Sequence, residues 1–188
     1  MEAKRENILM AAMEEFSKYG FHGSRMDNIA KRAGIGKGTI YGYFDSKKTL
    51  FYEMIKYGIE EYIAGLDGLL AKDESLEEKL YDIYDFHKSY LRKCLDIRQA
   101  IMSEKEVLPK ELMLDIIEDF KRISHSMERA IEEAIKRGEL RKDLDPKIAS
   151  IIIMGSIGQF YGNKMCPKNE AKDIEIGDLI DTLLRGLK

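Results

Sequence analysis

The chain has 188 residues and a net charge of −3, which by itself argues against nucleic acid as a partner. The charge is unevenly distributed, however. Residues 1–50 carry 9 Lys and Arg against 6 Asp and Glu, whereas residues 51–188 carry 22 against 28. Within residues 17–48, 7 basic side chains stand against 2 acidic ones. A basic head on an acidic body is expected when only one end of a protein meets phosphate.

The sequence shows no membrane or secretion signal. No stretch approaches the ~18 apolar residues of a membrane span, and the polar N-terminus lacks the apolar run of a signal peptide. Cys94 and Cys166 stand far apart, which is typical of reduced thiols rather than a disulfide. We therefore expect a cytoplasmic protein without membrane association.

Helical periodicity runs along nearly the whole chain, and the 3 prolines with the many Leu, Ile, Glu and Lys favour helix. In the head we expect a first helix that ends near Gly20, and a second that begins with a capping box of Ser24 and Asp27. A short third helix follows over about 37–44, and then a long fourth that ends near Leu66. The body is expected to hold five more, over about 75–91, 96–106, 110–137, 146–161 and 176–184. Ser75 with Glu78 predicts a capping box for the first of these, and Asp145 predicts the N-cap of the fourth. This predicts an all-α fold of about nine helices.

The second and third helices are joined by a tight glycine turn at residues 33–36, which makes them a helix-turn-helix candidate. The third helix has about eight residues and is therefore roughly 12 Å long, which matches the width of the DNA major groove. At 100° per residue, Ile40 and Phe44 face the core of the head. The outward face and its flanks carry Lys37, Gly38, Thr39, Tyr41, Gly42 and Tyr43, and Lys47 and Lys48 open the next helix. This pattern predicts a DNA-binding surface.

These residues resemble the DNA-binding head of the TetR family. The resemblance covers about residues 4–54 and rests on FSKYGF (16–21), IAKRAGI (29–35), GKGTIYGYF (36–44) and SKKTL (46–50). The segment RGELRKDLDP (137–146) is also similar to one that precedes the penultimate helix of such proteins. The resemblance implies a dimeric transcriptional regulator, usually a repressor, that binds a palindromic operator and is controlled by a small molecule. It divides the chain into a DNA-binding domain (1–48) and an effector-binding and dimerisation domain (49–188).

The resemblance also assigns residues. Lys37, Gly38, Thr39, Tyr41, Tyr43 and Lys47 match the DNA-contacting positions of the family. Ser24 and Arg25, which are also expected to contact DNA, stand where threonines are common. Gly36 replaces a capping serine, and Gly42 occupies a position that often contacts a base. Two glycines on the outward face cost helix stability, about 1 kcal/mol each relative to Ala. Close approach of the backbone to DNA would offset that cost, and DNA shape would then carry much of the specificity.

The body is expected to enclose the effector, because the family usually binds it among these helices. The candidates are the aromatic and Met side chains Phe86, Tyr90, Met102, Met113, Phe120, Met127 and Phe160. No run of charge indicates an ionic effector, so we expect an apolar or amphipathic ligand. Glycines at three- and four-residue spacing and an apolar flank on the last helix predict a dimer interface made of Gly155, Gly158, Gly162, Leu179, Ile180, Leu183 and Leu184.

Other functions fit less well. The Gly36–Thr39 string is not a phosphate-binding loop, because that motif needs Gly in place of Lys31 and Ser or Thr in place of Gly38. No set of nucleophile, base and acid predicts an enzyme, and the three isolated histidines predict neither a metal site nor a cofactor. An architectural DNA-binding protein of the same fold, acting through a protein partner without an inducer, is the main alternative.

Overall fold

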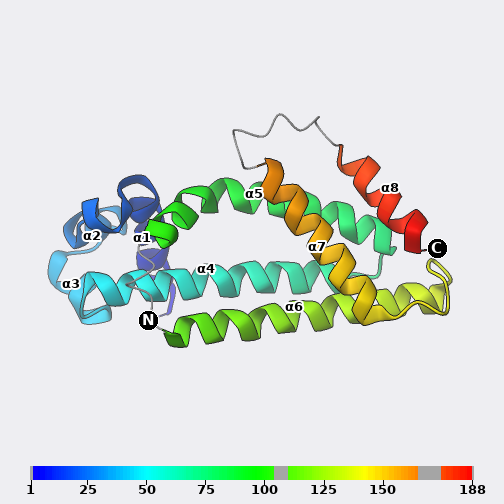
Figure 1. Cartoon of the computed structure of the whole chain (residues 1–188). Helices are drawn as coiled ribbons and strands as arrows, with labels where there is room; N and C mark the ends of the chain where they lie inside the picture. Colours follow the sequence, from blue (N-terminus) through cyan, green and yellow to red (C-terminus); the bar gives the residue numbers. More distant parts are fainter. Residues whose placement is uncertain (1, 104–109, 165–174, 188) are drawn as a thin grey trace. The chain divides into compact units, whose positions relative to one another are not determined.

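The computed structural model describes residues 2–103, 110–164 and 175–187, and every regular element in these stretches is an α-helix (Figure 1). The helices are α1 (Glu2–Gly23), α2 (Met26–Arg32), α3 (Lys37–Tyr43), α4 (Lys47–Leu70), α5 (Leu76–Ser103), α6 (Lys110–Arg137), α7 (Pro146–Lys164) and α8 (Ile176–Leu187). The predicted all-α class is confirmed, with 8 helices where about nine were expected.

The chain forms two compact units. The first contains Met1–Tyr62 and Ser89–Ile117, and the second contains Ile63–Lys88 and Glu118–Lys188. Helices α4, α5 and α6 therefore contribute to both units, whereas α1–α3 belong to the first and α7 and α8 to the second. The division predicted at residue 48 follows function rather than compactness, and it stays a prediction.

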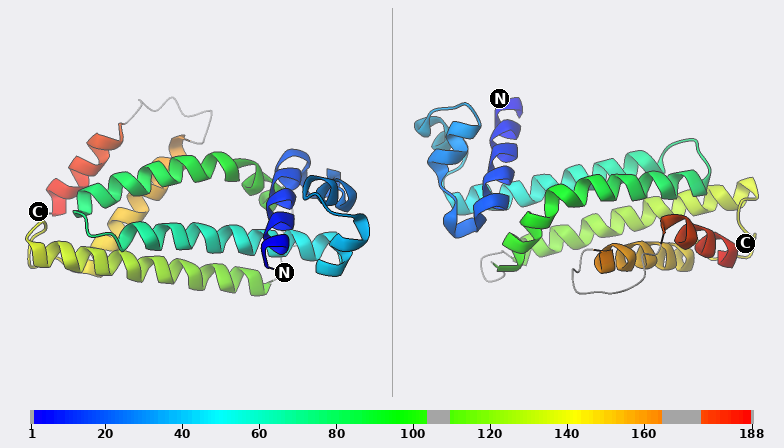
Figure 2. Two further views of the ribbon diagram at one scale, coloured as in Figure 1. Left: turned by 180° about the vertical axis from the view of Figure 1, so that it is seen from behind. Right: turned by 90° about the horizontal axis from the view of Figure 1, so that it is seen from above.

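In the first unit, α1, α2 and α3 pack around the start of α4 (Figures 1 and 2). The centre of this packing is aromatic: the Phe16 ring lies 4.9 Å from that of Phe51, in an edge-on arrangement. The buried side chains of this core include Ile8, Leu9, Ala12, Phe16, Ile29, Ile40, Phe44, Leu50, Phe51 and Met54. Positive φ angles at Gly20 (67°) and Gly34 (68°) kink α1 and make the turn between α2 and α3.

In the second unit, the predicted helix starts are confirmed. The Ser75 and Glu78 side chains form the capping box of α5, since the Ser75 amide donates to Glu78 Oε2 (2.9 Å) and the Glu78 amide donates to Ser75 Oγ (3.3 Å). Asp145 caps α7 by accepting hydrogen bonds from the amides of Lys147 (2.8 Å) and Ile148 (3.2 Å). Gly138 follows α6 with a φ of 79°.

Two sequence predictions about the helices were wrong. Residues 76–103 form one helix, because the polar stretch between the two expected helices contains neither Gly nor Pro and nothing in it stops helical hydrogen bonding. The capping box at Ser24 is also absent: the N-cap of α2 is Arg25, without a side-chain hydrogen bond. Helix α4 continues to Leu70, beyond the expected end near Leu66.

Candidate nucleic-acid interface and effector site

The outward face of α3 is open and nearly bare. Ile40 and Phe44 are buried in the head, as the spacing predicts, while Lys37, Thr39 and Tyr41 are exposed. Gly38 and Gly42 are exposed too, and a Cβ atom built on either would meet no heavy atom within 4 Å. The fold therefore does not need glycine at these two positions. Tyr43 is half-buried against the head core, so it presents only part of its ring outward.

The basic side chain at the start of α3 is tied to α2. Lys37 Nζ lies 2.9 Å from Asp27 Oδ2, and both side chains are exposed. The hydrogen bond and the charge of Asp27 raise the pKa of Lys37, so the ammonium stays protonated. Because an exposed pair of this kind contributes little to stability, the ammonium can exchange Asp27 for a phosphate. Arg25, at the N-cap of α2, is exposed on the same part of the head.

Ser24 does not present its side chain to DNA. It is 2 % exposed, and its hydroxyl donates to the carbonyl oxygens of Gly20 (2.6 Å) and Glu15 (3.1 Å). The hydroxyl instead closes the last turn of α1, where carbonyl groups lack helical partners. The Ser24 side chain therefore has a structural role in the head, and a contact between Ser24 and DNA stays a prediction.

The two lysines that open α4 differ. Lys47 Nζ donates to the carbonyl oxygens of Phe21 (2.8 Å) and Ser24 (3.0 Å) and lies 4.6 Å from the centre of the Phe21 ring. Lys47 thus joins the start of α4 to the end of α1. Lys48 is exposed, with its ammonium 5.5 Å from the Tyr52 ring centre. Of the two, Lys48 has the ammonium that is better placed for phosphate.

Ionic and hydrogen-bonded contacts that the sequence did not predict brace α2 against α1 in the head. Glu15 is 1 % exposed, and its carboxylate accepts hydrogen bonds from Asn28 (2.9 Å) and Arg32 (3.2 Å). Arg32 also pairs with Glu14 (3.0 Å), and these carboxylates raise the pKa of its guanidinium. The brace joins α1 to α2 and so helps to hold α2 and α3 in place. No local pattern reveals it, because the partners lie 13 to 18 residues apart.

Two of the predicted effector residues pack against glycines of α4. In the second unit, the Phe86 ring occupies the place of a side chain at Gly65: a Cβ there would lie 2.6 Å from Phe86 Cε2 and closer still to Cζ. In the first unit, the Tyr90 hydroxyl donates to the Gly58 carbonyl. Both aromatic side chains are half-buried. The glycines of α4 therefore serve close packing against α5.

The remaining effector candidates lie in different environments. Met127 and Phe160 are buried in the second unit, with the Phe160 ring 6.1 Å from that of Tyr84. Phe120 is 54 % exposed in the single chain. The side chains of Met102 and Met113 lie outside the described residues. For each of these residues, contact with an effector stays a prediction.

The predicted dimer residues divide between α7 and α8. Ile180, Leu183 and Leu184 are buried within the single chain, where the last two are 9 % and 6 % exposed, and Leu179 is half-buried. These residues of α8 therefore leave less apolar surface for a second subunit than their helical spacing indicated. On α7, Gly155 and Gly158 are exposed, while the exposure of Gly162 is outside what the structure describes. The same helix exposes Ile148, Ile151 and Ile152, which the prediction did not include.

Among the described residues, no group of three or more His, Cys, Asp or Glu could hold a metal ion. None of the described helices is both long and apolar enough to cross a membrane.

Comparison with known proteins decides the family. Residues 8–54 match the model of "Bacterial regulatory proteins, tetR family", and residues 73–162 match "Tetracyclin repressor-like, C-terminal domain". A fatty acid metabolism regulator of Bacillus subtilis is 30% identical over 158 residues, which cover 83% of this chain and 80% of that protein. The chain belongs to the TetR family. It is a DNA-binding transcriptional regulator, and the residues that match the family's first model, 8–54, run from α1 into the start of α4.

Other transcriptional regulators extend the comparison. The transcriptional regulator RutR of Escherichia coli is 28% identical over 178 residues, covering 91% of this chain and 79% of that protein. The structure of FadR from Bacillus subtilis in complex with stearoyl-CoA matches with a TM-score of 0.61 and 26% identity, covering 96% of this chain and 95% of that one. A TetR-family regulator from Mesorhizobium loti reaches a TM-score of 0.73 at 22% identity, with 98% and 95% covered.

Proposed function

We propose that this TetR-family regulator binds a two-fold symmetric operator as a homodimer, that it represses transcription there, and that a fatty acyl-CoA or a similar amphipathic molecule releases it. The observation that carries the proposal is the function of one relative and the ligand bound to another. The relative that covers 83% of the chain is a fatty acid metabolism regulator, and a structural neighbour at 26% identity is held in complex with stearoyl-CoA. The apolar or amphipathic ligand expected from the sequence agrees with this class.

In this proposal α3 enters the major groove with its bare face toward the bases. Gly38 and Gly42 let the backbone approach DNA, so base contacts fall to Thr39 and to the outward part of Tyr43. Lys37, Lys48 and Arg25 supply positive charge for phosphates. Lys47 has a different part: it fixes the start of α4 against the end of α1, and so positions the helix that follows α3.

Helix α4 is the proposed link between effector and DNA. It begins at the head with Lys47 and continues as one helix to Leu70. At Gly58 and Gly65, where α4 has no side chain, it packs against Tyr90 and Phe86, two of the proposed effector contacts. A ligand that moves either ring would change how α4 packs. It releases DNA only if it favours a state in which the two heads no longer match half-sites about 34 Å apart.

The proposed dimer interface centres on α7. Ile151 is 69 % exposed, and Ile148 and Ile152 lie beside it at helical spacing, next to the exposed Gly155 and Gly158. Apolar side chains beside glycines are suited to close packing of a second helix. Ile151→Glu should give monomers in light scattering with little loss of thermal stability, because the side chain is not part of the subunit core. A dimer that persists in Ile151→Glu would place the interface elsewhere.

The test of effector and class is a competition experiment. A duplex selected by the purified protein is labelled, bound to saturation, and titrated with stearoyl-CoA, with CoA and stearate as controls. Release by stearoyl-CoA at micromolar concentration supports the proposal, and coupling of about 1–3 kcal/mol corresponds to a 5–150-fold loss of DNA affinity. If stearoyl-CoA leaves DNA affinity unchanged, the effector class is wrong. If no small molecule has an effect, the architectural alternative gains.

A further inference from the structure

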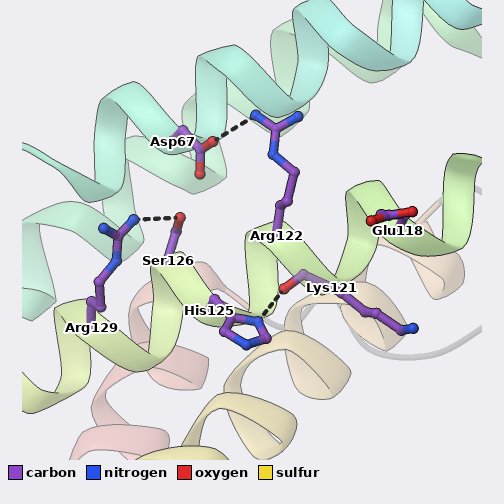
Figure 3. A pocket seen from close by; sticks show the side chains of 7 residues that line it. All are labelled: Asp67, Glu118, Lys121, Arg122, His125, Ser126 and Arg129. Carbon is purple, nitrogen blue, oxygen red and sulfur yellow. Dashed lines mark hydrogen bonds and ion pairs between the residues drawn. The ribbon is translucent and has the colours of Figure 1, made fainter.

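Glu15 is the only acidic residue that is buried in the described parts of the chain, and 1 % of its surface is exposed. Carboxylates elsewhere form ion pairs nearer the surface: in the second unit, for example, Asp67 is 31 % exposed where it lies 3.6 Å from Arg122 (Figure 3). Burial of a carboxylate costs folding free energy, and a well-packed apolar side chain often stabilises a core as well or better. Stability alone therefore does not explain a carboxylate at this place.

Glu15 bonds to the segment of α2 at three points. Its carbonyl oxygen accepts a hydrogen bond from the hydroxyl of Ser24 (3.1 Å), which stands two residues before α2. Its two carboxylate oxygens accept separately, Oε1 from the Asn28 amide (2.9 Å) and Oε2 from the Arg32 guanidinium (3.2 Å). Asn28 and Arg32 are four residues apart, so they share one face of α2. A rotation of α2 about its axis, or a tilt against α1, therefore strains these bonds.

The direction of α3 follows from that of α2. The Ile35 amide donates to the Ala30 carbonyl (2.9 Å) across the turn between the two helices, and Ile29 of α2 and Ile40 of α3 are buried in one core. The 7 residues of α3 extend about 10 Å, so a tilt of about 10° moves the far end of the helix by about 2 Å. A shift of that size breaks a hydrogen bond to the edge of a base.

We propose that Glu15 is a positioning residue for operator recognition, which sets the direction of α3 through its bonds to α2. The inference rests on the proposed entry of α3 into the major groove, and it requires neither the effector nor the dimer interface. An apolar side chain of similar size would also be buried, but apolar contacts are not directional, and α2 would be free to turn against α1. The carboxylate bonds only where its two donors lie.

The variant Glu15→Leu separates the direction of α3 from the stability of the head. It leaves no buried donor without a partner, because Asn28 is exposed and Arg32 keeps its bond to Glu14 (3.0 Å). Its Tm should therefore be close to the native value or above it. Glu15→Gln is a second variant of the same shape, whose amide has one acceptor oxygen where the carboxylate has two.

The test compares affinity for the operator that the native protein selects with affinity for a random duplex of the same length. It is made at one salt concentration and at a temperature where the variants are folded. A loss of stability lowers both affinities by the same factor, whereas a turned α3 lowers operator affinity alone. For Glu15→Leu the operator-to-random ratio should fall about tenfold or more, the loss expected for one mismatched base pair. Glu15→Gln should give a smaller fall.

Glu14→Gln is the matched control for Glu15→Gln. It removes the same charge from α1 and one bond to the same Arg32, but it leaves the buried carboxylate in place. Its operator-to-random ratio should equal that of the native protein. A native ratio in Glu15→Leu, or an equal fall in Glu14→Gln and Glu15→Gln, would overturn the inference. If Glu15→Leu does not fold, the comparison of the two Gln variants decides.

Thr39→Ala shows which proposal fails. If Thr39→Ala lowers the operator-to-random ratio and Glu15→Leu does not, α3 reads DNA and only the role of Glu15 is wrong. If the native protein binds the two duplexes equally, the entry of α3 into the major groove is wrong, and the role of Glu15 fails with it.

Discussion

Replacing Lys47 with Ala should destabilise the head, whereas the same change at its neighbour Lys48 should not. Lys47 donates to two backbone carbonyls, those of Phe21 and Ser24, and lies over the Phe21 ring, while the ammonium of the exposed Lys48 lies over the Tyr52 ring. Both residues are lysines at the start of α4, so the two substitutions remove the same charge. The comparison therefore separates a structural role from a DNA contact.

The size of the effect follows from these contacts. A hydrogen bond from a charged group contributes about 1.5–3 kcal/mol. Because Lys47 is half-exposed, solvent screens part of that value, and we expect a loss of about 2 kcal/mol for both bonds together. For a chain of this length each kcal/mol lowers Tm by about 2–4 °C, so Lys47→Ala should melt about 4–8 °C below the native protein. Lys48→Ala should melt within about 1–2 °C of it.

The assay has two readouts, thermal unfolding and the salt dependence of DNA binding. Lys48→Ala should lower the slope of log affinity against log salt by about 0.9, the value for one phosphate contact, on operator and random DNA alike. Lys47→Ala should lower Tm and keep that slope, measured at a temperature where the variant is folded. The reasoning fails if Lys47→Ala keeps its Tm and loses one phosphate from the slope.

Three further predictions concern specificity, packing and pH. Thr39→Ala should weaken operator binding while leaving random DNA unaffected; equal losses on both would make Thr39 a phosphate contact. Gly65→Ala should lower the free energy of unfolding in urea by about 1–3 kcal/mol, because the Phe86 ring must move. Gly68→Ala, which has open space at Cβ, should raise it by up to about 1 kcal/mol. Similar values for the two variants would refute close packing of Phe86 on Gly65. Burial lowers the pKa of His87, so protonation favours the unfolded chain, and the stability of the protein should fall as the pH drops below about 6.5. Between pH 7.5 and 5.5, the His87→Gln variant should lose less stability than the native protein. An equal loss in the two proteins would exclude His87 as the cause.

The sequence predicted the helices well where local signals mark them. The glycine turn at Gly34, the capping box at Ser75 and the N-cap at Asp145 are each contained in a few adjacent residues. The inward position of Ile40 and Phe44 follows from helical spacing in the same way. The prediction was wrong where the signal was weak, as in the polar stretch that was expected to split α5.

The sequence predicted which segment forms the candidate site better than it predicted what each side chain contacts. Lys47 and Ser24 stand in the segment expected to bind DNA, yet their side chains bond to carbonyl groups of α1 and, for Lys47, also of Ser24, which follows α1; only the folded head brings these groups close. A lysine or serine has several possible partners, and local spacing does not choose among them. The same holds for Leu183, which is apolar enough for an interface but is covered by its own subunit.

The central claim is that α3 enters the major groove of DNA with the face of Gly38 and Gly42 toward the bases. Selection of duplexes from a random pool tests this claim most directly. The native protein should enrich a two-fold symmetric sequence with half-site centres one helical turn, about 34 Å, or a multiple of it apart. Gly42→Leu should melt at an equal or higher temperature, because its Cβ meets open space and Leu is the better helix former, yet it should enrich nothing. Enrichment of the same sequence by a folded Gly42→Leu variant would contradict the account.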